Sequence, residues 1–288
     1  MKILLTGANG FLNSRIHKKY NEKHEIISLT RKDLDITDFK RAEKIIKNEN
    51  PDIIIHGAAM SETKLCEDNP KLAYRVNVDS ALNIGRISKE IKAKLIFLSS
   101  EQVFNGNENE GPYKEDDKAY PNTIYGKTKL EAENLLKKEG DDLVILRLSW
   151  MFGLPERNTT NNSNLFWRLL SNIIKNESIK VSDNEFRGIT YVYDLIDNLE
   201  KIFNLESGIY HFGSDNDLST YDISYLVLKE IGLTDKRIKK LLIKDTLKYK
   251  NKKRDLRMSY EKIKREGIYI KKSKESVKDA LKEFNFYL

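Results

Sequence analysis

Residues 1–13 of this chain, MKILLTGANGFLN, decide its fold. The apolar run at residues 3–5 predicts a buried strand, Gly7 and Gly10 predict a tight turn, and Phe11 begins a predicted helix. Such a turn places free backbone N–H groups and the positive end of the helix at one point, which suits a phosphate. We therefore interpret it as a dinucleotide-binding turn, although an ordinary strand-to-helix turn can carry the same residues.

The composition excludes several classes of protein. The chain has 288 residues, of which 39% are hydrophobic and 33% charged, and no apolar run approaches the ~20 residues needed to cross a bilayer. Because the first strand starts at once, a signal peptide is not expected. Cys66 is the single cysteine, and the four histidines lie far apart in sequence. We expect a cytoplasmic protein with no internal disulfide, no metal site and no membrane partner.

Positive charge is concentrated in one block. Residues 236–272 hold sixteen Lys or Arg against four Asp or Glu, a net charge of +12, and the rest of the chain sums to −5. A basic block can bind nucleic acid, but aromatic residues are sparse there and no nucleic-acid-binding motif is visible. We expect a solvated lysine-rich face, a few of whose members face an anionic substrate, and no nucleic-acid partner.

Strands and helices alternate through the first half, which is typical of a doubly wound parallel α/β sheet of the Rossmann type. The strands are predicted at residues 3–5, 25–29, 52–56, 94–99 and 143–148, and the helices at 11–22, 39–48, 70–91 and 125–138. Later elements are helices at 165–176, 192–204, 220–231 and 273–284 and a strand at 208–213. We predict a cofactor-binding domain at 1–152, rejoined by about 188–214, and a smaller α/β substrate-binding domain at 153–187 and 215–288.

Reductases with this fold use a tyrosine and a lysine four residues apart on one helix face. The lysine lowers the pKa of the tyrosine, which can then protonate a carbonyl oxygen. Four such pairs begin at Tyr125, Tyr225, Tyr249 and Tyr260, so the spacing alone is uninformative. Only Tyr125 begins a helix that follows the strand ending in Ser99 and Ser100. We expect the other three on a surface helix.

Several blocks, in the same order, resemble motifs of the dTDP-4-dehydrorhamnose reductase family of extended short-chain dehydrogenases. These blocks are TGANGFLN at 6–13, HGAA at 56–59, SSEQVFNG at 99–106, PYKE at 112–115, PNTIYGKTK at 121–129, RLSW at 147–150 and GIYH at 208–211. The resemblance spans roughly residues 1–260 and is more specific for the family than for one substrate.

The resemblance implies an NAD(P)H-dependent reduction of a 4-keto group on a nucleotide-linked deoxysugar, in a protein that is often a homodimer. Tyr125 would be the proton donor. Lys129 would lower the pKa of Tyr125 and bind the cofactor ribose, and Ser100 would hydrogen-bond the substrate carbonyl. The implied cofactor residues are Gly7, Gly10, Phe11, Leu12, Asp35, Ile36, Ala58 and Ala59, and the implied substrate residues are Ser61, Gln102, Trp150 and Arg187.

Cofactor preference depends on the residue after the second strand. An NAD-selective site carries an acidic residue there, about 20 residues beyond the glycines. This chain has Thr30 and Arg31, and an arginine can bind a 2′-phosphate with two hydrogen bonds. We therefore predict NADPH as the cofactor, with NADH as the alternative.

Departures from the family pattern leave alternatives open. Asn13 replaces the third glycine of the turn, and its side chain could either donate to the pyrophosphate or obstruct the cofactor. Glu101 and Gln102 replace the aspartate and tyrosine that follow the serine pair. One alternative function is a catalytically silent nucleotide-binding subunit, which would not need Ser100, Tyr125 and Lys129. Another is a nucleotide-sugar epimerase or dehydratase, but a dehydratase would want a second acid where Gln102 stands.

Overall fold

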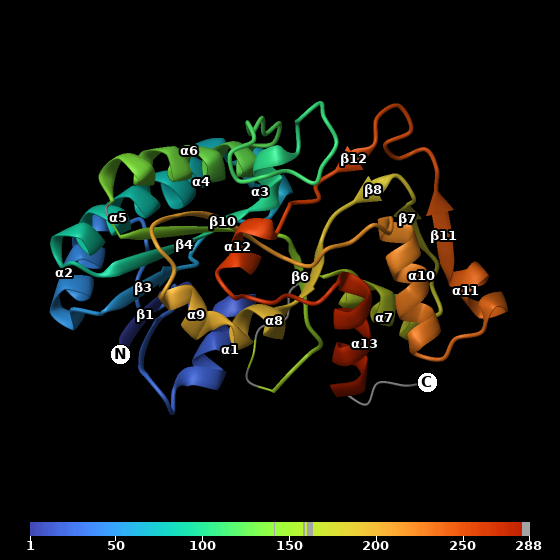
Figure 1. Cartoon of the computed structure of the whole chain (residues 1–288), viewed down its shortest axis with the longest axis horizontal. Coiled ribbons are helices and arrows are strands. Elements are labelled where there is room, and N and C mark those ends of the chain that lie inside the picture. Colours follow the sequence, from blue (N-terminus) through green and yellow to red (C-terminus); the bar gives the residue numbers. More distant parts are fainter. Residues whose placement is uncertain (141, 158, 160–163, 284–288) are drawn as a thin grey trace.

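A six-stranded parallel sheet forms the centre of the protein. The computed structural model describes residues 1–140, 142–157, 159 and 164–283. The strands follow the order β10-β5-β4-β3-β1-β2, which is that of a doubly wound sheet (Figure 1). Their bounds are Lys2–Thr6 for β1, Glu25–Leu29 for β2, Ile53–His56 for β3, Lys94–Ser100 for β4, Leu143–Leu148 for β5 and Gly208–Phe212 for β10.

Helices cover both faces of this sheet. Successive strand residues face opposite sides, so that Ile3 and Leu5 join one hydrophobic core and Leu4 joins the other. The second core is closed by α2 (Phe39–Glu49), α5 (Ser80–Glu90) and α6 (Ile124–Glu139). The first is closed by α1 (Phe11–Tyr20), α8 (Val192–Asp197) and α9 (Leu199–Phe203) (Figure 1). The predicted doubly wound α/β fold is confirmed.

Most of residues 164–191 and 214–255 form a smaller lobe beyond the carboxyl ends of the strands, whereas residues 261–265 pack against β10 of the main sheet (Figure 1). The strands of the smaller lobe pair in parallel as β11–β7, β12–β8 and β6–β9, the last pair joining the two lobes because β6 directly follows β5. The strands are β6 (Trp150–Phe152), β7 (Ile179–Ser182), β8 (Glu185–Phe186), β9 (Ile189–Tyr191), β11 (Leu242–Asp245) and β12 (Arg254–Asp255). The helices are α7 (Leu165–Lys175), α10 (Thr220–Glu230), α11 (Asp235–Leu241), α12 (Glu261–Arg265) and α13 (Ser273–Glu283).

Two long helices predicted from the sequence are interrupted. Residues 70–91 form α4 (Pro70–Tyr74), a π-helical turn η1 (Arg75–Asp79) and α5, and the π turn fits one extra residue into the helix. Residues 192–204 divide into α8 and α9 at Asn198. The Nδ2 of this asparagine donates hydrogen bonds to the carbonyl oxygens of Asp194 and Tyr269. The sequence also missed α3 (Thr63–Asp68) and the 3₁₀ turn η2 (Glu101–Phe104). Within the described residues, no helix has the length and apolarity that a membrane crossing needs.

Candidate active site

The glycine turn has the geometry that a phosphate requires. Gly7 has a φ of +65°, and a Cβ atom there would lie 2.9 Å from the Cα of Ala58, so conformation and space both require glycine. Gly10 is the N-cap of α1 and has no side chain to cap the first turn. The N–H groups at the start of this ten-residue helix are therefore not capped by the residue that precedes it.

A cleft of about 660 Å³ opens from this turn along the carboxyl ends of β1, β2 and β3. The predicted cofactor residues among its lining are Gly7, Gly10, Arg31, Asp35, Ile36, Ala58 and Ala59. Ser61, predicted for the substrate, lines the same cleft. Leu12 instead packs in the core with 8% of its surface exposed, and the ring of Phe11 lies under the Arg15 guanidinium. Phe11 and Leu12 nevertheless begin α1 directly after the glycine turn, so their expected place along the pyrophosphate turn stays a prediction.

Asn13 takes neither of the two orientations considered from the sequence. Its side chain is buried. Its Nδ2 donates to the carbonyl oxygen of Thr6, the last residue of β1, at 2.8 Å. The same nitrogen would lie 2.5 Å from a Cβ on Gly57, so Gly57 makes room for it. The side-chain amide of Asn13, which stands where the family pattern has its third glycine, thus links α1 to β1 by a hydrogen bond.

Ser100, Tyr125 and Lys129 come together at the carboxyl end of β4. Ser100 is the last residue of β4 and caps η2, and Tyr125 and Lys129 lie one turn apart at the start of α6. The Ser100 hydroxyl lies close enough to the Tyr125 phenol to lower its pKa. The Lys129 ammonium lies 3.9 Å from the centre of the Phe97 ring. The sequence predicted this grouping, and the strand order places β4 next to β3, whose carboxyl end borders the cleft.

Burial controls the protonation of both groups. It raises the pKa of Tyr125 to about 12, against a smaller lowering by the Ser100 hydrogen bond. Burial lowers the pKa of Lys129 to about 7, against the attraction of Glu133. The expected lowering of the tyrosine pKa by lysine is therefore not found. A neutral phenol is nevertheless the form that a proton donor needs.

Asn77 connects the cleft to α6, the helix that carries Tyr125 and Lys129, a link that the sequence did not predict. Its Oδ1 accepts from Met60 N at 2.8 Å, and its Nδ2 donates to Met60 O and to the hydroxyl of Thr128. Met60 lines the cleft, and Thr128 lies on α6 beside Lys129. Asn77 lies in the π-helical turn, so this irregular turn places a buried amide between both walls of the site.

The predicted substrate residues meet where the smaller lobe faces η2. Arg187 forms an ion pair with the buried Glu101, and its guanidinium lies 4.6 Å from the Trp150 ring centre. Gln102 accepts a hydrogen bond from Arg254 at 3.1 Å. Glu101 and Gln102 therefore each bind one arginine of the smaller lobe, Arg187 and Arg254 respectively. The sequence offered no signal for either pair, although Arg254 belongs to the block expected to face an anionic substrate.

The other tyrosine–lysine pairs do not form comparable sites. Tyr225 lies on α10 and donates to Asp235, and Tyr249 lies in a turn with a φ of 63° rather than on a helix. Tyr260 is only 2% exposed, and its hydroxyl would lie 2.6 Å from a Cβ on Gly188. The expectation that all three lie on a surface helix is wrong for Tyr249 and Tyr260. Among the described residues, no cluster of His, Cys, Asp and Glu suits a metal ion.

Comparisons with known proteins agree with this architecture. The family model described as RmlD substrate binding domain matches residues 1–286. A dTDP-4-dehydrorhamnose reductase of Aggregatibacter actinomycetemcomitans is 32% identical over 239 residues, which cover 80% of this chain and 79% of that protein. The spore coat polysaccharide biosynthesis protein SpsK of Bacillus subtilis is 31% identical over 233 residues, covering 81% and 80% of the two chains.

Solved structures give the same result. The crystal structure of a dTDP-4-dehydrorhamnose reductase ortholog from Clostridium acetobutylicum superposes with a TM-score of 0.86 at 26% identity, covering 99% of this chain and 100% of that one. Together, the match along the chain and the shared fold confirm the resemblance inferred from the sequence motifs. The chain belongs to the RmlD substrate binding domain family, the family of the dTDP-4-dehydrorhamnose reductases.

Proposed function

We propose that this chain reduces the 4-keto group of a nucleotide-linked 6-deoxysugar with NADPH or NADH. The family is one of NAD(P)-dependent oxidoreductases, and the specific reaction is supported by the grouping of Ser100, Tyr125 and Lys129 at the end of β4, the strand next to β3. A catalytically silent subunit would not need this grouping.

Ser100, Tyr125 and Lys129 each have a separate role in the proposed carbonyl reduction. NAD(P)H bound in the cleft would supply a hydride for the carbonyl carbon. Ser100 donates a hydrogen bond to the carbonyl oxygen and orients it toward Tyr125, whose phenol is kept neutral by burial and can give up its proton. Lys129 would bind the cofactor ribose, and its ammonium would stabilise the phenolate that remains after proton transfer.

The nucleotide-sugar part of the proposal rests on charge and shape. Trp150 offers a flat apolar surface for the sugar ring. Arg187 lies beside this ring and Arg254 is near enough to Arg187 to repel its charge, so the two could bind a diphosphate together. The names of two relatives, a dTDP-4-dehydrorhamnose reductase and a polysaccharide biosynthesis protein, point to this substrate class.

We also propose that NADPH is preferred over NADH. Arg31 lines the cleft directly after β2, and the same side chain attracts Asp35 and helps to lower its pKa, after the hydrogen bonds from Thr37. A 2′-phosphate bound there would gain a cationic partner that a ribose hydroxyl does not need.

The experiment combines an NADPH titration with turnover of a panel of 4-keto nucleotide sugars. Tyr125→Phe should bind NADPH like the wild type and lose turnover by about a hundredfold or more, the scale for a general acid. Tyr269→Phe is the matched control, because Tyr269 is 68% exposed and should be neutral. Equal turnover by Tyr125→Phe would remove it from the mechanism. NADPH binding without turnover of any sugar would favour the silent subunit.

A further inference from the structure

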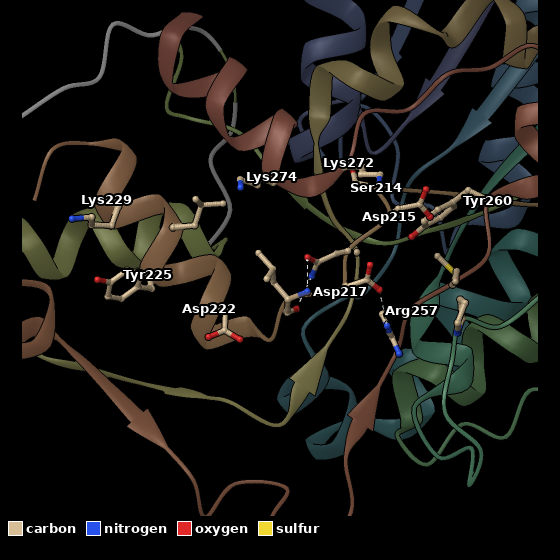
Figure 2. Close-up of a pocket in the computed structure, with 16 residues that line it drawn as sticks. Ser214, Asp215, Asp217, Asp222, Tyr225, Lys229, Arg257, Tyr260, Lys272 and Lys274 are labelled. Carbon is tan, nitrogen blue, oxygen red and sulfur yellow. Dashed lines mark hydrogen bonds and ion pairs between the residues drawn. The ribbon is translucent and has the colours of Figure 1, made fainter. Parts of the chain in front are cut away.

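Lys129 differs from the other buried cations of the protein. Three Lys or Arg side chains are buried in the described part of the chain, and two of them, Arg15 and Arg147, each bind a carboxylate at 2.8 Å. Arg257, which is only partly buried and lines a cavity of about 610 Å³ between α10 and the start of α13, also pairs with Asp217 at 3.0 Å (Figure 2). Lys129, with 2% of its surface exposed, forms neither an ion pair nor a hydrogen bond through its ammonium with any described residue.

The nearest carboxylate along α6 is already occupied. Glu133 lies one helical turn beyond Lys129, at a spacing where opposite charges can pair. Its Oε1 instead accepts from the hydroxyl of Ser99, and its Oε2 accepts from Nη2 of Arg147 at 2.8 Å. The charge of Glu133 is therefore compensated by Arg147 and attracts Lys129 only at longer range.

The ammonium of Lys129 lies against an aromatic ring instead. Its Nζ is 3.9 Å from the centre of the Phe97 ring, well inside the ~6 Å within which a ring face attracts a cation. Phe97 is only 1% exposed, so both partners are shielded from water. Because a cation–π contact is stronger when the cation is desolvated, this contact should be stronger than one at the protein surface.

The central sheet fixes the position of this ring. Phe97 on β4 lies directly opposite His56 on β3, and the two rings stack with their centres 5.9 Å apart. His56 is paired in the same way with Thr6 on β1, and its Nδ1 is hydrogen-bonded to the Thr6 hydroxyl at 2.8 Å. A row of side chains on three neighbouring strands, which begins beside the glycine turn, therefore supports the surface on which the ammonium lies.

The other titratable groups beside Lys129 are neutral. Burial, and after it the positive charge of Lys129, lowers the pKa of His56 to about 3. Burial raises the pKa of Tyr125 to about 12, and it also raises the pKa of the Cys66 thiol, which lies on α3 near this phenol. None of these groups supplies a negative charge at pH 7, so the ring of Phe97 is the contact that favours the charged form of the amine.

We infer that Phe97 is a positioning residue for Lys129, and that the face of its ring holds the charged ammonium one helical turn from Tyr125. The inference rests on the proposed function, in which this ammonium stabilises the phenolate. A ring face attracts an ammonium without binding all three of its N–H groups, so these stay available to the hydroxyl groups of a ribose. A carboxylate at the same place would compete for them.

The test is an NMR titration that measures the pKa of Lys129 in the cofactor-free full chain, made with isotope-labelled lysine. The Lys129 signal is identified by its loss in Lys129→Met. Phe97 is replaced by phenylalanines that carry one, two or three ring fluorines, which weaken the negative ring face and change its shape little. The pKa of Lys129 should fall with each fluorine, and by about one unit in Phe97→Leu, which is about a tenfold change in the protonation equilibrium.

The pH dependence of turnover measures the consequence for the reaction. Turnover of a 4-keto nucleotide sugar should be lost as the pH rises and Lys129 loses its proton, and this loss should move to lower pH along the fluorinated series. Fluorination of Phe212 is the matched control, because this ring is fully buried in β10 of the same sheet and no described cation lies over it. The pKa of Lys129 should then be unchanged.

Two results would overturn the inference: a Lys129 pKa that stays constant along the Phe97 series, or one that falls equally when Phe212 is fluorinated. The NMR titration needs no substrate and uses shape-conserving replacements, so it does not depend on Phe97→Leu folding normally. A stepwise fall of the pKa in a protein that reduces no sugar would support the contact and count against the proposed function instead.

Discussion

Lys129 should reduce the stability of the protein at neutral pH. Its pKa is lowered from 10.5 to about 7 by burial, and each pKa unit corresponds to about 1.4 kcal/mol. Charging the amine inside the fold therefore costs up to about 5 kcal/mol. Lys129→Met removes the charge and keeps a flexible side chain of similar length, so it should raise the free energy of unfolding at pH 7, by about 2–4 kcal/mol after relaxation of the site.

The pH dependence distinguishes this cause from simple repacking. Between pH 7 and pH 10.5 an unfolded Lys129 holds a proton that the folded protein lacks, so raising the pH stabilises the wild type. The advantage of Lys129→Met should be greatest near or below pH 7 and should shrink by up to about 1.4 kcal/mol per pH unit above it.

Urea unfolding of the cofactor-free protein at several pH values measures both effects. Lys127→Met, an exposed lysine on the same helix, is the control and should change stability little at any pH. A difference between Lys129→Met and wild type that is independent of pH would refute the reasoning, as would destabilisation at every pH. Lys129→Met should also lose turnover, since the same ammonium is proposed to stabilise the phenolate.

Three further predictions follow from single contacts. Arg31→Ala should weaken NADPH binding by about 1.5–3 kcal/mol, the scale of a charge-assisted hydrogen bond, and leave NADH binding unchanged. Equal losses of affinity for the two cofactors, measured by calorimetry, would show that Arg31 has another role. Asn13→Gly should lower the free energy of unfolding by about 1–2 kcal/mol, because it removes one hydrogen bond and puts a glycine inside a helix. Tighter NADPH binding by this variant would contradict the inward position of the side chain. Glu133→Gln leaves the buried Arg147 without its charge partner and should cost about 3–5 kcal/mol in urea unfolding, whereas a loss below 1 kcal/mol would show that the pair is dispensable.

The sequence by itself determined the features that depend on local pattern. Continuous apolar runs predicted the strands, since the residues of a doubly covered strand are buried on both sides. Gly7 predicted the turn because its positive φ excludes other residues, and the position of Tyr125 after the Ser99–Ser100 strand selected it from four candidate pairs. The family and the fold class followed from the same motifs. The domain boundaries, the cytoplasmic location and a homodimer stay predictions.

Only the tertiary structure decided the contacts between residues far apart in the chain. Asn77 reaches Thr128 across 51 positions, and Glu101 meets Arg187 from another lobe, because strand order and lobe packing bring these segments together. Asn13 turns inward because Gly57, directly after the neighbouring strand β3, leaves space, and Tyr260 is buried because Gly188 does. Sequence periodicity describes which face of an element is apolar. It carries no information about which distant side chain fills a given space, and that packing fixes the charges and hydrogen bonds of the site.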